Sequence, residues 1–528
     1  MAIALLCFSI ISLLLLPFAS LSPIPIDGTS WNGYITKLLN LTVDPCDDFY
    51  QFACGNFDDI YTMSESRSKM SQFVVNDEII VNKMLQLLNS KLEEMSDEQL
   101  AAGDAISKSL RYYKSCLQLE SDRSNGISTM REMVTAMGNF WFSDEPMPNS
   151  FDLTQMIIAM SRFTPSNLFY WGVGHDYYNS SRYLLHVVQA GMIMGSGTTE
   201  FYVNRTLEDD PYLQALQTKL VEYGNIITGI DQDGSYEIIT GHEGSGIESE
   251  EEEDELIIVS DRNVKKYVEE VIRLEQRFAE INEDIPNDQF SYVTLDWLDT
   301  EAPFVNWTLI FTTFFNDYDI DIASYENISI TSEHWLVHIH AFVLKEMSTE
   351  QGRRALRNYL IFRAVDDYAP YFRAFQNACH EFKSVLKGFK KPKPLTEFCF
   401  MDTDVTIGFP LGTLYVKEHF SIENKHAVMN LTEHIVKAFR RRVEKADWLL
   451  NGTQESALRK IDSILYDVGF PDWILNNTYL DNRYENLTVT DDYSKNQFYA
   501  YNYSLTKELQ VCLIDSQVVF FCQFLFRN

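Results

Sequence analysis

The sequence is poor in positive charge. Its 528 residues include 43 lysine and arginine residues against 76 aspartate and glutamate residues, a formal net charge of −33 at pH 7. Binding to nucleic acid or to an anionic membrane surface requires clustered basic side chains that displace counterions. We therefore expect no nucleic-acid partner. Hydrophobic residues make up 45% of the chain and aromatic residues 13%, which is enough for large globular cores.

Several catalytic motifs are also missing. No His-Glu-x-x-His segment occurs, the arrangement in which two imidazoles one helical turn apart hold zinc and the glutamate activates water. His242-Glu243 and His380-Glu381 begin such a motif, but neither continues to a second histidine. His334 and His338 lie one turn apart without a glutamate between them, which favours ordinary surface or packing histidines over a structural or adventitious metal site. Since no Gly-x-Ser-x-Gly elbow or cysteine nucleophile signature is present either, we expect no catalytic and no metal-binding residue.

Cysteine is scarce, with eight residues in the chain. Cys7 lies in the apolar N-terminal segment, so seven remain beyond it. An odd number in a secreted protein leaves at least one thiol unpaired or available to another chain. A disulfide-linked oligomer is therefore one expectation.

The N-terminal segment 1–22 has the features of a signal peptide. Residues 2–21 carry no charge and include the run Leu13–Leu16, followed by Pro17 and small residues. A secreted, extracellular protein is the expectation that follows. The alternative is an uncleaved type II anchor in the plasma membrane, because about 20 apolar residues can span a bilayer.

Ten Asn-x-Ser/Thr sequons independently favour secretion, because this motif is the acceptor for N-glycans on exposed positions. We predict glycosylation among Asn40, Asn179, Asn204, Asn306, Asn327, Asn430, Asn451, Asn476, Asn486 and Asn502.

Apolar spacing predicts a mainly helical chain with a few strands. Helices are expected over 79–95, 105–119, 264–281, 355–386 and 431–449, and strands near 168–174 and 183–189. In segment 431–449, Leu431, Ile435 and Phe439 share an apolar face of the predicted helix. Arg440–Arg442 lie on the opposite face, which we expect to be solvated. The Gly-rich stretch 191–197 predicts a turn, and the Gly-, Ser- and Glu-rich stretch 241–255 predicts a solvated acidic loop.

Four segments carry a resemblance to a known family. They are Asp44-Pro45-Cys46-Asp47-Asp48-Phe49-Tyr50-Gln51-Phe52-Ala53-Cys54-Gly55-Asn56-Phe57, the helix-like run Arg354–Arg363, the stretch Ile407–Val416, and Lys460-Ile461 with Val468–Trp473. In this order and spacing they resemble the N-terminal domain of the neprilysin-like zinc metallopeptidases, peptidase family M13. The resemblance covers about residues 40–508, and the tail 511–528 diverges from it.

The resemblance implies a mainly α fold, the large helical lobe of the neprilysin-like fold with minor β elements and an incomplete catalytic lobe. It implies zinc endopeptidase action on small extracellular peptides for the family. The segments that bind zinc and the substrate backbone in that family are not found in this chain, so the chain itself is expected to be inactive and to bind no zinc. The alternative is a secreted noncatalytic pseudo-enzyme that binds short peptides or pairs with an active relative.

The resemblance also assigns individual residues. It implies a disulfide between Cys116 and Cys399, and it implies that Lys69 or Arg67 holds the C-terminal carboxylate of a substrate. Cysteines placed like Cys46 and Cys54 pair in the family with residues of the C-terminal region. A helical lobe without that region is expected to expose apolar surface, which favours aggregation.

Overall fold

The computed structural model describes residues 31–510 except 122, 148–150, 166, 180–181, 196, 230–234, 240–255, 285–289, 317–321 and 323–326. The expected signal segment 1–22, the acidic loop 241–255 and the tail 511–528 lie outside the described residues. The chain divides into two compact units, Met1–Val75 and Asn76–Asn528.

The first unit is built from three short helices, α2 (Trp31–Leu38), α3 (Phe49–Cys54) and α4 (Phe57–Ile60). Asp48 caps α3, because its carboxylate accepts a hydrogen bond from the backbone N–H of Gln51 at 3.0 Å. The Asn56 side chain donates to the carbonyl oxygen of Leu39 at 2.7 Å, which ties the end of α3 to the end of α2. Gly55 permits this close approach, since a Cβ atom there would lie 2.9 Å from the Cβ of Asn40.

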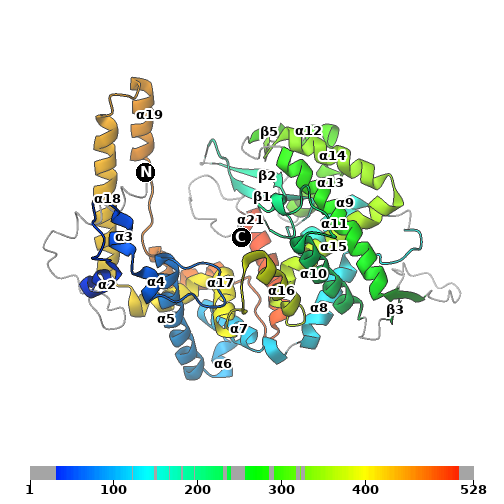
Figure 1. Cartoon of the computed structure of the whole chain (residues 1–528), viewed down its shortest axis with the longest axis horizontal. Helices are drawn as coiled ribbons and strands as arrows, with labels where there is room; N and C mark the ends of the chain where they lie inside the picture. The colour runs from blue at the N-terminus through cyan, green and yellow to red at the C-terminus, as the bar shows by residue number, and fades with distance from the viewer. Residues whose placement is uncertain are drawn as a thin grey trace. The chain divides into compact units, whose positions relative to one another are not determined.

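The second unit is mainly helical, which confirms the predicted fold class (Figure 1). Helix α5 (Gln72–Glu94) leads into it. The helices that follow are α6 (Asp97–Leu100), α7 (Ala105–Leu117), α8 (Arg123–Ala136), α9 (Leu153–Ser161), α10 (Pro211–Thr228), α11 (Asp261–Asp284), α12 (Leu295–Glu301), α13 (Trp307–Phe315), α14 (Glu333–Met347), α15 (Glu350–Tyr368), α16 (Gln376–Lys387), α17 (Leu395–His419), α18 (Ile422–Glu444), α19 (Asn451–Asp462), α20 (Asn477–Tyr484) and α21 (Tyr493–Gln510).

A four-stranded sheet lies among these helices, with the order β1 (Phe169–His175), β2 (Tyr183–Gln189), β6 (Asn327–Ile330) and β5 (Ser291–Thr294). The β1–β2 and β5–β6 pairs are antiparallel, and β2 and β6 are parallel. Strands β1 and β2 occupy the two segments in which strands were predicted. A separate hairpin is formed by β3 (Ser235–Ile239) and β4 (Leu256–Ser260).

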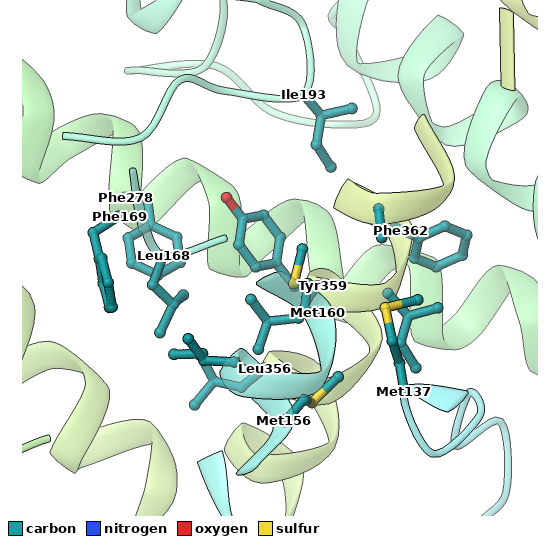
Figure 2. Close-up of a cluster of buried hydrophobic side chains, with 14 of the residues drawn as sticks. Met137, Met156, Met160, Leu168, Phe169, Ile193, Phe278, Leu356, Tyr359 and Phe362 are labelled. Atoms are coloured by element: carbon teal, nitrogen blue, oxygen red, sulfur yellow. The ribbon is translucent and has the colours of Figure 1, made fainter. Parts of the chain in front are cut away.

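The larger core lies between one face of the four-stranded sheet and the helices α8 to α16. Phe169, Trp171 and Val173 of β1 alternate toward this core, as expected for a strand with one buried face. Figure 2 shows part of it, where side chains of α9 and α15 gather with Leu168, Phe169 and Phe278. Tyr359 of α15 is among them.

A second core joins α5, α7, α17, α20 and α21. At its centre the carboxylate of Asp402 accepts hydrogen bonds from the hydroxyl groups of Tyr112 and Tyr493, each at 2.7 Å, and from the side-chain amide of Gln497 at 2.8 Å. Helix α17 bends inside this core, because Ile407 has non-helical dihedral angles three residues before Pro410.

Two predicted helices differ from the expectation, one because it is interrupted and one because it ends early. The segment 355–386 is divided into α15 and α16 by a short 3₁₀ turn, Ala369–Tyr371, because Pro370 has no N–H to continue the α-helical ladder. The segment 431–449 stops being helical after Glu444.

The turn predicted at 191–197 is confirmed by the hydrogen bond from the Gly195 N–H to the carbonyl oxygen of Met192, 2.9 Å, with φ of 118° at Gly195.

Candidate functional site

The histidine pair that came closest to a zinc motif lies on the surface of α14. His334 and His338 are both exposed, and their ring centroids are 4.2 Å apart. Nδ1 of His338 lies 2.8 Å from the backbone carbonyl oxygen of His334, so this ring nitrogen carries a proton and donates a hydrogen bond to that oxygen. A zinc ion there would find two exposed imidazoles and no carboxylate between them, which is too few ligands for a protein zinc site.

The part of the chain that the structure describes contains no other group of side chains that could bind zinc. Among the described residues, no three His, Cys, Asp or Glu side chains are placed to hold one metal ion together. His380 and Glu381 lie on α16, with Ser384 where a second histidine would be needed. His242 and Glu243 lie outside the described residues. The described residues therefore do not fit a catalytic zinc ion.

The two basic residues predicted to contact a substrate lie in the first unit, in the loop between α4 and α5. Lys69 is exposed and Arg67 is partly buried, with its backbone N–H donating to the carbonyl oxygen of Ser64 at 3.0 Å. The Lys69 ammonium group is thus accessible to an anionic ligand. A single exposed charge of this kind is weakly attractive in water.

The sequon asparagines lie mostly on the surface. Nine are exposed, namely Asn179, Asn204, Asn306, Asn327, Asn430, Asn451, Asn476, Asn486 and Asn502. The tenth, Asn40, is partly buried, and its side-chain oxygen accepts hydrogen bonds from the backbone N–H and hydroxyl group of Thr42 at 3.1 and 2.6 Å. This distribution is compatible with the predicted glycosylation.

Helix α18 exposes the face that the sequence predicted to be apolar. Ile435 is 60% exposed and Phe439 52% exposed, and Val428 and Leu431 continue the same line at helical spacing. We call these four residues the α18 stripe. Helix α19 packs beside α18 (Figure 1) and is tied to it by the Arg440 Nε–Asp462 Oδ1 ion pair at 2.9 Å. The stripe remains uncovered by any of the described residues of its unit.

A buried carboxyl group lies in the larger core, and the sequence analysis did not single it out. Glu275 of α11 has no exposed surface, and it accepts hydrogen bonds from the Ile193 N–H at 2.6 Å and the Tyr202 hydroxyl group at 2.9 Å. Burial raises the pKa of Glu275 to about 7, against the opposing effect of the nearby Arg363 guanidinium group. The available signal was an acidic residue at an apolar position of the helical repeat, between Val271 and Phe278.

Comparison with known proteins decides the family. Residues 45–471 match the model of the N-terminal domain of peptidase family M13, which is well over half of the chain. The chain belongs to peptidase family M13. Its neprilysin-like character is supported by its relatives, which include an endothelin-converting enzyme homolog of Locusta migratoria and neprilysin-3 of Drosophila melanogaster.

The M13 chain matches these relatives along most of its own length. It is 25% identical to the Locusta protein over 485 residues, 90% of the chain and 61% of the relative. It is 26% identical to Drosophila neprilysin-3 over 487 residues, 90% of the chain and 57% of the relative. The chain therefore spans about three fifths of the length of the curated relatives that it matches.

Solved structures show the same fold. The zinc metalloprotease Zmp1 of Mycobacterium tuberculosis, in complex with an inhibitor, matches with a TM-score of 0.65 at 16% identity, covering 90% of this chain and 64% of Zmp1. PepO from Lactobacillus rhamnosis matches with a TM-score of 0.60 at 13% identity, covering 88% of this chain and 66% of PepO. At these identities the likeness establishes the fold of the M13 chain.

No helix among its described residues combines the length and the apolar composition that crossing a bilayer requires.

Proposed function

We propose that this chain supplies the helical lobe of a neprilysin-like endopeptidase that acts on small extracellular peptides, and that these 528 residues alone hydrolyse no peptide. Two observations together carry the proposal. Residues 45–471 match the M13 N-terminal domain, and no His-Glu-x-x-His segment occurs anywhere in the 528 residues. Hydrolysis by this family's chemistry needs zinc, three protein ligands and a base to activate water.

The α18 stripe supports the assignment to a lobe. Four apolar side chains in line on one helix leave an unfavourable apolar surface in water, and such patches mark surfaces that another polypeptide segment covers. The relatives are longer than this chain, since it covers 57–61% of their length. We propose that the α18 stripe is covered by a segment like the one by which these M13 relatives exceed this chain in length.

The test is a peptidase assay on the purified full chain with quenched fluorescent peptides and added zinc. We expect no hydrolysis that EDTA removes. Chelator-sensitive cleavage would overturn the proposal. A double variant, His334→Ala with His338→Ala, is included because cleavage that this variant abolishes would place a working metal ion on α14.

A noncatalytic pseudo-enzyme is the second candidate, and the exposed Lys69 side chain favours it. In this proposal Lys69, with Arg67 two residues before it, holds the carboxylate of a short peptide without cleaving it. Calorimetric titration with a short peptide carrying a free C-terminus should show binding that weakens when the C-terminus is amidated. Equal binding of the two peptides would argue against this role, and Lys69→Ala should reproduce the effect of amidation.

Secretion belongs to the same proposal, with a plasma-membrane anchor as its alternative. The support is the apolar segment 1–22 and the exposure of nine sequon asparagines. Intact mass of the protein after enzymatic removal of N-glycans separates the two. Recovery from the culture medium with loss of about the first 22 residues supports secretion. Retention of that segment in the membrane fraction supports the anchor.

A further inference from the structure

The last turn of α21 places a carboxyl group inside the protein. Glu508 is 7% exposed, and its Oε1 accepts a hydrogen bond from the Val173 N–H at 2.7 Å. β1 stands at one edge of the four-stranded sheet, where outward-facing amides have no neighbouring strand to bond. Glu508 therefore supplies the acceptor for an edge amide of β1 and ties the end of α21 to it.

The absence of a side chain at Gly172 makes this contact geometrically feasible. A Cβ atom at Gly172 would lie 2.1 Å from Oε1 of Glu508, a distance that non-bonded atoms do not adopt. A small cavity of about 20 Å³ adjoins the carboxyl group, lined by Pro165, Tyr170, Trp171, Tyr501, Ser504, Leu505 and Glu508 itself. More of its lining surface is apolar than polar, and its volume is close to that of one water molecule, so little water reaches Glu508 from this side.

The titratable groups that face Glu508 provide no positive charge. Tyr170 of β1 and Tyr501 of α21 are near it, and the negative charge of Asp367 on α15 also acts on Tyr501, whose pKa is raised mainly by burial. On β2, His186 is the register partner of Gly172, and burial lowers the pKa of His186, which favours its neutral form. No ion pair to Glu508 occurs among the described residues. An ionised carboxylate with one amide donor and no cation is unfavourable in such surroundings.

We propose that Glu508 is a pH-dependent latch, which holds the end of α21 on the β1 edge while its carboxyl group is protonated and releases it when the group ionises. The protonated form still offers Oε1 to the Val173 N–H and brings no charge into the interior. Ionisation favours any conformation in which the last turn of α21 leaves β1 and the carboxylate reaches water.

The direction of the effect follows from the position of the titration. Burial raises the pKa of Glu508 from its ordinary value of 4.5 to about 7. A carboxyl group whose pKa is raised on docking stabilises the docked state fully below 4.5 and loses that contribution as the pH rises through about 7. Because each pKa unit corresponds to a tenfold change in equilibrium, the docking constant should fall on the order of 100-fold across this interval.

Hydrogen–deuterium exchange of the full chain tests the latch. After correction for intrinsic exchange rates, protection of the peptides covering 168–175 and 503–510 should fall between pH 5 and pH 8 in the unaltered protein. Glu508→Gln keeps the shape and the acceptor oxygen but cannot ionise, so both peptides should keep the same protection at both pH values.

Glu275→Gln is the matched control, since Glu275 is a second buried carboxyl group that accepts from a backbone amide, in this case Ile193. It should leave the pH dependence of 168–175 unchanged and alter only the peptide that contains Ile193. A latch at Glu508 is overturned if exchange at 168–175 and 503–510 is independent of pH, or if Glu508→Gln shows the same pH dependence as the unaltered chain.

Gly172→Ala covers the case in which Glu508→Gln fails to fold. Its added methyl group displaces the Glu508 carboxyl group, so both peptides should exchange fast at pH 5 as well as at pH 8. Preserved slow exchange at pH 5 in Gly172→Ala would overturn the latch.

Discussion

Cys116 of α7 and Cys399 of α17 form a disulfide with their Cα atoms 5.6 Å apart, although they are 283 positions apart in the sequence. This is the pairing that the family resemblance implies. Both residues are fully buried in the second core, next to the Asp402 carboxylate that binds Tyr112 and Tyr493. The disulfide joins α7 to α17, and the hydrogen bonds to Asp402 hold the same two helices and add α21 through Tyr493.

Removal of the disulfide should strongly destabilise the second core. For a loop this long the chain-entropy model gives about 5 kcal/mol, and removal of native disulfides lowers the free energy of unfolding by about 2–5 kcal/mol. We expect a loss in that range for the double variant Cys116→Ser with Cys399→Ser, measured by urea unfolding. Cys46→Ser is the control, because Cys46 is exposed and should leave the free energy of unfolding unchanged. A loss below about 1 kcal/mol in the double variant would contradict the expectation.

A buried ion pair between α11 and α15 should be sensitive to loss of one partner. Arg354 is 8% exposed and Glu270 7% exposed, and two nitrogens of the guanidinium group each lie 3.1 Å from a carboxylate oxygen. Arg354→Met leaves the Glu270 charge buried and should lower the free energy of unfolding by about 3–5 kcal/mol.

The exposed pair Lys91–Glu94 of α5 provides the comparison, with side chains 39% and 56% exposed. Lys91→Met should change the free energy of unfolding by less than about 1 kcal/mol, because surface ion pairs are screened by water and salt. Equal effects of the two methionine variants in urea unfolding would show that burial of Arg354 is not what matters.

The buried Glu275 should make stability depend on pH. Its folded-state pKa, about 7, lies above its ordinary value of 4.5, so the unfolded state loses its proton first as the pH rises. Glu275 then stabilises the fold fully below 4.5, and up to about 3 kcal/mol of that contribution is lost as the pH passes about 7.

Glu275→Gln removes this titration and should flatten the difference between free energies of unfolding measured at pH 5 and pH 8. The glutamine retains an acceptor for the Ile193 N–H, so the variant tests charge more than shape. An unchanged difference between the two pH values would place the titration elsewhere in the protein.

The α18 stripe should cause self-association of the isolated chain. Apolar side chains in line on an exposed helix associate to leave water, so sedimentation velocity should detect dimers or larger species. The double variant Ile435→Asp with Phe439→Asp should shift the protein toward monomer without loss of helical content. His434→Asp, about 100° around the helix from Ile435, is the control and should sediment like the unaltered chain. Association that persists in the stripe variant would exclude the stripe as its cause.

The sequence alone determined the features that depend on local pattern. Apolar spacing located α5, α7 and α11, strand-like runs located β1 and β2, and glycines marked the turn at Gly195. These predictions succeeded because helix, strand and turn preferences act between residues close in the chain. The segments from Asp44 to Trp473 carried the family resemblance, and the missing His-Glu-x-x-His segment is a property of the sequence itself.

Only the tertiary structure decided which polar groups are buried and which apolar faces are exposed. Glu275 and Glu508 are acidic residues on helices like many others in this chain, and their surroundings come from α10, α15, β1 and the segment around Ile193, all distant in sequence. The stripe at Ile435 has the pattern of a buried face, yet it is exposed. Burial depends on which remote segments pack together, and periodicity along one helix does not contain that information.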